Sequence, residues 1–275
     1  MGSMLLLGAA YGVLKEGLMV TSFFSPNWPD LGAMAAYGRW LDVNWVWAEM
    51  LTIYHAVFSI SIPILLVELA YPQRKSENWI GKKLFIALLA VLFTLTVFGF
   101  FLFSSFMNYW TPAPQYLFGI ALMVLSIYLA RTLPTTLRQQ RQKITPKSIV
   151  LWLFFHRGRI CLLPRFLGTA LCRYSLGDCM LYGPLLILLV ASFVKRFNWH
   201  QEPNGTHLFA LVSGALTFFI IFAPLQELDK NRSDVTTGMS LVAQAFTIGL
   251  IWLGLKIKRR NPTLKTMPTL PNKPS

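Results

Sequence analysis

Charged residues are scarce in this sequence, and their scarcity excludes an ordinary soluble domain. Only 13% of the 275 residues are charged and 55% are hydrophobic, whereas about 25% of residues are charged in typical soluble proteins. Acidic residues are fewer than basic ones, with 11 against 25. The basic residues gather in loops and in the C-terminal tail, so we expect them to orient membrane spans and to contact anionic headgroups. We expect no nucleic-acid binding, because no basic globular domain remains for it.

Cysteine is also scarce, and the known catalytic signatures are absent. The three cysteines, Cys161, Cys172 and Cys179, form no CxxC pair, and their odd number argues against a disulfide framework. His156 makes no metal-ligand spacing with them. The chain contains no GxSxG, HExxH, Walker A or strand-placed GxGxxG motif. We therefore expect no metal and no other cofactor, and the sequence leaves open whether the protein is an enzyme.

Long apolar runs predict an all-α fold, a polytopic bundle of transmembrane helices. About 20 mostly apolar residues are needed to cross a bilayer. Six clear runs of this kind occupy residues 4–24, 45–70, 84–106, 115–130, 208–225 and 235–255. The stretch 149–197 is ambiguous, because it is apolar but carries several arginines. It holds either two poor crossings, at 164–182 and 183–197, or a segment that lies at the membrane surface.

The positions of basic residues predict the topology. Basic segments precede the third span, follow the fourth and form the tail, which places all three on the cytoplasmic side. An even number of crossings must then separate the last two, and we favour two crossings within 149–197. We predict seven or eight spans in one domain, residues 1–260, followed by a disordered basic tail, residues 261–275. The favoured count of eight places both termini in the cytoplasm. The expected location is the cytoplasmic membrane of a prokaryotic cell. Because the chain opens almost directly into a span, a longer parent protein is an open alternative.

Two ionisable residues, Glu16 and His55, interrupt the first two spans at matching depths. Span one is centred near Leu14 and span two near Val57, and the two spans run in opposite directions. At a rise of 1.5 Å per residue, both side chains lie about 3–5 Å from the midplane on the same side. We therefore predict that the two residues meet between adjacent antiparallel helices. Charges within hydrocarbon are costly, so such a pair indicates a functional site.

Other polar side chains extend this candidate site. Thr52, His55 and Ser59 recur at i, i+3 and i+7, within about 60° of one helical face. Such a stripe lines a solute path or an intramembrane active site, or it holds two helices together by polar contacts. Lys15 is a further candidate for an internal site. Residues adjacent in an α-helix do not face each other, so we predict that Lys15 points away from Glu16.

Further features shape the first two spans and the loop between them. Gly8 and Gly12 form a GxxxG motif that permits close approach of helices. Pro63 frees a backbone carbonyl near Ser59 and is expected to kink span two. The loop 23–44 is rich in aromatic, proline and acidic residues. It is longer than a simple connection, and we expect it to pack as a cap.

Several strings in the first 72 residues resemble an uncharacterised family of prokaryotic multi-pass membrane proteins. They lie at Tyr11–Leu18, Ser22–Trp28, Val43–Trp47 and Tyr54–Pro63, with a fainter likeness at Ala223–Leu228. The resemblance implies a helical integral membrane protein and brings no established activity with it. In that family pattern an acidic residue stands where this chain has Lys15. The departure disfavours a mechanism based on two carboxylates.

The sequence leaves three functions open. The first is a small-solute permease or proton-linked transporter, with Glu16 and His55 as a buried titrating pair, because histidine changes charge near physiological pH. The second is an intramembrane enzyme acting on a lipid or isoprenoid, with His55 as general base or metal ligand. The third is a structural or assembly subunit. Expected partners are the lipid bilayer and a small solute or lipid, and a homo-oligomer is also open.

Overall fold

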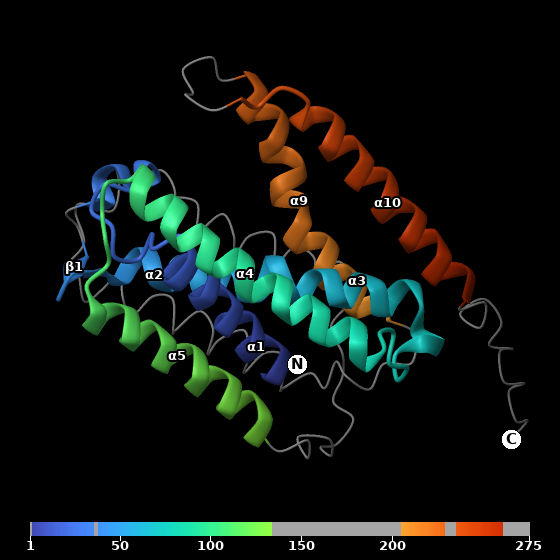
Figure 1. Cartoon of the computed structure of the whole chain (residues 1–275). Coiled ribbons are helices and arrows are strands. Elements are labelled where there is room, and N and C mark those ends of the chain that lie inside the picture. The colour runs from blue at the N-terminus through green and yellow to red at the C-terminus, as the bar shows by residue number, and fades with distance from the viewer. Residues whose placement is uncertain (1, 36–37, 134–204, 229–234, 261–275) are drawn as a thin grey trace, which may run out of the picture. The chain divides into compact units, whose positions relative to one another are not determined.

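The computed structural model describes residues 2–35, 38–133, 205–228 and 235–260, which are largely helical (Figure 1). The chain begins with α1 (Gly2–Gly12), which continues into a π-helical segment, η1 (Val13–Met19). A second long helix consists of α2 (Trp45–Tyr54), the π-helical η3 (His55–Ser61) and α3 (Ile62–Ala70). The remaining elements are the 3₁₀-helices η2 (Pro29–Ala35) and η4 (Pro72–Arg74), the paired strands β1 (Arg39–Trp40) and β2 (Val43–Asn44), and the helices α4 (Lys82–Phe106), α5 (Ala113–Thr132), α9 (Thr206–Leu228) and α10 (Met239–Arg260).

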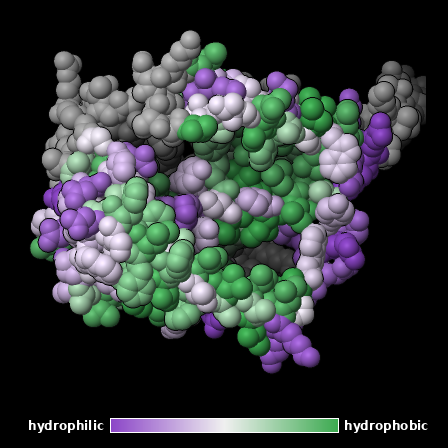
Figure 2. Space-filling model, turned by 45° about the horizontal axis from the view of Figure 1, so that its top comes forward, coloured by the Kyte–Doolittle hydropathy of each residue, from purple (hydrophilic) through white to green (hydrophobic). Residues whose placement is uncertain are grey.

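Five of the described helices are long and apolar enough to cross a membrane. They are Trp45–Ala70, Lys82–Phe106, Ala113–Thr132, Thr206–Leu228 and Met239–Arg260. Figure 2 shows broad apolar surface on one face of the molecule, with hydrophilic residues in separate groups around it. The structure thus confirms the prediction of an all-α membrane protein. The predicted crossings within 149–197 and the predicted tail 261–275 lie outside the described residues.

The first predicted span, residues 4–24, ends earlier than its apolar run. The helix stops at Met19, and Thr21 takes a positive φ of 60°. Phe23 and Phe24, which were predicted to lie in the span, are 5% and 1% exposed in a buried apolar cluster. The predicted end of this span was therefore wrong. The reason is that hydropathy alone does not distinguish a side chain that faces lipid from one that packs in a protein core.

The segment that follows, residues 20–35 and 38–44, is the cap, and it packs as predicted. Phe24, Leu31 and Val43 are buried with the start of α2 in one apolar cluster. Asn44 is fully buried, and its side chain accepts a hydrogen bond from the N–H of Trp47, which caps the N-terminus of α2. The cap is therefore held both by apolar packing and by its junction with α2.

Packing divides the described chain into two units. The first contains residues 2–64 and 74–133, and the second contains residues 65–73, 205–228 and 235–260. In the first unit, α1 packs against η3 and α5, and η1 packs against α4 and α5. In the second unit, α9 packs against α10, and the last turns of α3 join them through a cluster of Leu69, Leu253 and Ile257. All five candidate site residues lie in the first unit.

Candidate functional site

The contact of α1 with α2 and η3 depends on two glycines. A Cβ atom added to Gly8 would lie 2.6 Å from the Cα of Ala56, and one added to Gly12 would lie 3.1 Å from the Cα of Thr52. The predicted close approach at the GxxxG motif is thus confirmed. Gly8, Gly12 and Glu16 follow one another at intervals of four residues, so the glycines share a helical face with Glu16.

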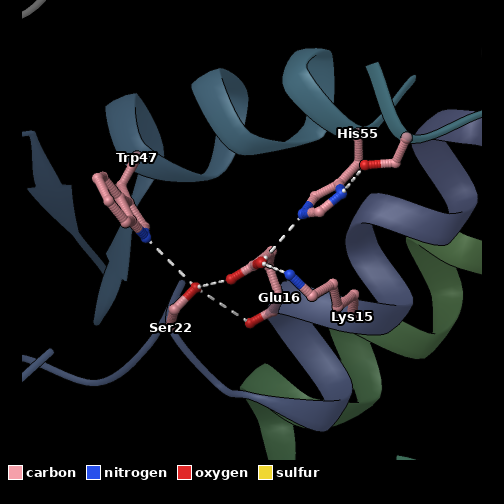
Figure 3. Close-up of polar contacts among 6 residues, drawn as sticks. Lys15, Glu16, Ser22, Trp47 and His55 are labelled. Atoms are coloured by element: carbon pink, nitrogen blue, oxygen red, sulfur yellow. Dashed lines mark hydrogen bonds and ion pairs between the residues drawn. The ribbon is translucent and has the colours of Figure 1, made fainter. Parts of the chain in front are cut away.

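Glu16 and His55 meet across this contact (Figure 3). His55 Nε2 lies 3.0 Å from Glu16 Oε1, and the two residues are only 4% and 6% exposed. Side chains on a helix tilt toward its N-terminus. Glu16 therefore reaches back toward the level of Gly12, where His55 arrives from the antiparallel helix. The contact that the matching depths predicted is confirmed.

The pair belongs to a longer chain of hydrogen bonds. Ser22 Oγ donates to Glu16 Oε2 at 2.7 Å and accepts from Trp47 Nε1 at 3.3 Å. On the other side of the pair, His55 Nδ1 lies 2.7 Å from Ser59 Oγ. Two segments that are distant in sequence, η1 with the start of the cap and α2 with η3, are thereby joined by polar contacts (Figure 3).

Lys15 also contacts Glu16, which corrects the prediction that it points away. Lys15 Nζ lies 3.0 Å from Glu16 Oε1. The prediction assumed an α-helix, but η1 is a π-helix, which has more residues per turn and so brings neighbours closer around the axis. The flexible four-carbon stem of lysine covers the remaining distance. The Lys15 side chain is 40% exposed, whereas that of Glu16 is 8% exposed.

Both members of the pair lie in π-helical segments. The N–H of Val20 donates to the carbonyl of Lys15, and the N–H of Ile62 donates to the carbonyl of Val57. The second segment ends just before Pro63, which has no N–H and whose ring crowds the carbonyl four residues back. Pro63 was predicted to kink the span, and the structure shows a wider, π-helical turn just before it. Such π-helical turns are frequently found at functional sites.

Aromatic rings surround the imidazole of His55. Tyr11 and Tyr54 meet it edge-on, with ring centroids at 5.7 and 5.3 Å. Thr52, which shares the predicted polar stripe, is half-buried where α1 passes at Gly12. The structure therefore brings Lys15, Glu16, His55 and Ser59 together, whereas Thr52 contributes to the contact between the helix backbones.

The arrangement provides a place where a proton can be held and exchanged. Histidine has one donor and one acceptor nitrogen when neutral, and two donors when protonated. With Ser59 on one nitrogen and Glu16 on the other, both forms of His55 find partners. Among the residues that the structure describes, no group of three or more His, Cys, Asp and Glu side chains is placed to hold a metal ion.

Sequence reasoning missed Ser22 and the role of Trp47. Ser22 was assigned to an apolar span, but it is fully buried at the turn into the cap and bonded to Glu16. Trp47 was predicted only to lie at the start of the second span, yet it is 7% exposed and points its N–H to Ser22. Their sequence separation of 25 residues left no local pattern that would have linked them.

Comparison with known proteins finds no similar protein. The chain matches no protein-family model, no curated protein and no solved structure. Function is therefore inferred from the contacts and burial of the site itself.

Proposed function

We propose that this protein is a proton-linked transporter of small solutes, in which Glu16 and His55 exchange a proton during transport. The observation that carries the proposal is the position of His55, buried between Glu16 and Ser59 near the middle of the predicted spans. Ionisable groups at that depth are costly and mark ion or proton pathways. His55 is the group that takes up the proton, because Glu16 and Ser59 contact its two ring nitrogens and provide partners in both protonation states.

The finer topology belongs to the same proposal. We propose eight spans, with both termini in the cytoplasm, and a location in the cytoplasmic membrane of a prokaryotic cell. Its support is the distribution of basic residues: Lys82 and Lys83 begin α4, Arg131 lies in the last turn of α5, and α10 ends in Lys258, Arg259 and Arg260. Basic residues at span ends favour the cytoplasmic side.

The test is proton flux in proteoliposomes that contain the full chain. A pH gradient is imposed in a mixed medium containing sodium, potassium, chloride, nitrate and lactate, and interior pH is followed with a trapped dye. We expect wild-type flux well above that of protein-free liposomes, and flux at the protein-free level for His55→Gln and Glu16→Gln. Ser126→Ala is the matched control, because Ser126 bonds only to the carbonyl of Leu122 in its own helix among the contacts described. Wild-type flux equal to that of empty liposomes would overturn the proposal.

A second candidate is an intramembrane hydrolase acting on a lipid, and one observation favours it. Ser59 Oγ, the His55 ring and the Glu16 carboxylate follow one another at 2.7 and 3.0 Å, the order of nucleophile, base and orienting acid in serine hydrolases. A fluorophosphonate probe separates the two candidates. Labelling that is lost in Ser59→Ala would favour the hydrolase, whereas no labelling and retained proton flux in Ser59→Ala favour the transporter.

A further inference from the structure

The polar groups of the site differ in how much binding capacity they have left. Glu16 Oε1 accepts from Lys15 and contacts His55, and Oε2 accepts from Ser22. Both nitrogens of His55 are likewise engaged. Lys15 carries three N–H donors, and among the described contacts it donates to Glu16 alone. Because its side chain is 40% exposed and that of Glu16 is 8% exposed, Lys15 is the more accessible of these two charged groups.

The net charge of the site changes when His55 is protonated. With neutral His55, the Lys15 ammonium and the Glu16 carboxylate cancel. With protonated His55, the three side chains carry one net positive charge. Of the elements packed on η3, α1 contributes Tyr11 and α2 contributes Tyr54 and Glu49. Glu49 lies six residues before His55, on a different helical face.

We propose that the transported solute is a small monovalent anion that binds Lys15 when His55 is protonated. This inference rests on the proposed function and names its substrate class. The anion contacts the free donors of Lys15, the proton sits on His55, and together they restore neutrality at a depth where net charge is costly. A proton and an anion then cross together, and the proton returns to water on the far side. A cation would instead need the Glu16 carboxylate, whose side chain is only 8% exposed and already accepts from Lys15 and Ser22.

Measuring proton flux in single salts, in place of the mixed medium, tests this inference independently of the proposed function. Proteoliposomes are prepared in single salts: chloride, nitrate or lactate with N-methylglucamine, and sodium or potassium with gluconate, a bulky anion. We expect rapid proton flux with at least one of the three small anions and protein-free rates in both gluconate salts. The flux is expected not to change when valinomycin and potassium set the membrane potential, because proton and anion carry no net charge together.

Substitutions of Lys15 provide the residue-level readout. Lys15→Gln removes the charge, and we expect the proton flux driven by small anions to be lost. Lys15→Arg retains the charge and is expected to keep it, which shows that loss in the first variant is not misfolding. Lys82→Gln, at an exposed lysine at the start of α4, is the control for charge removal and is expected to match wild type.

The outcomes distinguish a failure of the anion proposal from a failure of the proposed function. Flux in the mixed medium that persists in sodium or potassium gluconate, or flux that Lys15→Gln leaves intact, overturns anion transport and leaves the proton-linked transporter standing. Absence of flux in the mixed medium itself overturns the proposed function.

Discussion

Two helix pairs in this protein, α1–η1 against α2–η3 and α9 against α10, are held together in different ways. The first pair combines a line of glycines with buried polar side chains. The second pair keeps its charges at its ends: α9 carries no Asp, Glu, Lys or Arg before Glu227, and the charges of α10 begin at Lys256. Its packing is apolar, through residues such as Leu253 and Phe209.

Two glutamates show the difference most clearly. Glu227, at the end of α9, accepts hydrogen bonds from the N–H groups of Gly238 and Ser240 and so caps the start of α10. It performs a local task that stabilises a helix end. Glu16 is instead surrounded by the side chains of Lys15, Ser22 and His55 inside a helix contact. A stable helix pair does not require such a cluster, as α9 and α10 show, which favours a functional reason for it.

A double-mutant cycle on Glu16 and His55 tests directly whether their contact stabilises the first helix pair. Removing one partner leaves the other buried without its main contact, so we expect Glu16→Gln and His55→Ala each to destabilise by about 3 kcal/mol. We expect a coupling energy of about 1–3 kcal/mol between them in detergent melting experiments. Additive effects would contradict the contact. Strong coupling with unaltered proton flux in the variants would make the pair a structural contact of an assembly subunit.

Glycine substitutions test the two pairs at their closest approach. A Cβ on Gly8 would meet backbone atoms of Ala56, so we expect Gly8→Ala to destabilise by about 2 kcal/mol or more. Gly254→Ala in α10 would meet only the ring of Phe209, at 3.1 Å, and a side chain can move aside. Gly249 faces open space, and there alanine is expected to be neutral or stabilising. Thermal melting of the three variants should rank them in this order, and an equal effect at Gly8 and Gly249 would contradict the described packing.

Replacing Glu227 tests its local role at the start of α10. Glu227→Ala removes both acceptors for the N–H groups of Gly238 and Ser240, so we expect those two amides to exchange hydrogen faster, with a smaller loss of melting temperature than Gly8→Ala causes. Glu227→Gln keeps one carbonyl oxygen as acceptor and is expected to lie between wild type and Glu227→Ala. Proton flux should not change in either variant. A flux defect would mean that Glu227 does more than cap a helix.

The smallest expected effect is at the charged end of α10. Lys256 Nζ lies 4.7 and 4.9 Å from the ring centroids of Trp252 and Tyr71, and such cation–π contacts are worth about 0.5–1 kcal/mol at exposed sites. Lys256→Gln is therefore expected to lower the melting temperature slightly. Lys258→Gln is the control, since it removes the same charge from the same helical turn. Equal effects of the two substitutions would contradict a specific contribution from the rings.

Much of the fold and part of the site followed from the sequence. The second span was predicted with the bounds that the structure gives it, because a long apolar run with tryptophans at its start has a distinct composition. The pairing of Glu16 with His55 followed from depth, since helical rise converts sequence position directly into height in a membrane. The end of the first span did not follow, because Phe23 and Phe24 are equally apolar in lipid and in the core of the cap.

The amino-acid sequence was enough to predict the all-α membrane class, the meeting of Glu16 with His55 and the glycine face that brings their helices together. These depend on composition and on the regular rise and turn of a helix. Only the tertiary structure showed that Lys15 contacts Glu16 and that Ser22 and Trp47 extend the hydrogen-bond chain. The reason is that local π-helical geometry changes the directions of neighbouring side chains, and that contacts between the cap and the helices depend on how separate segments fold onto each other.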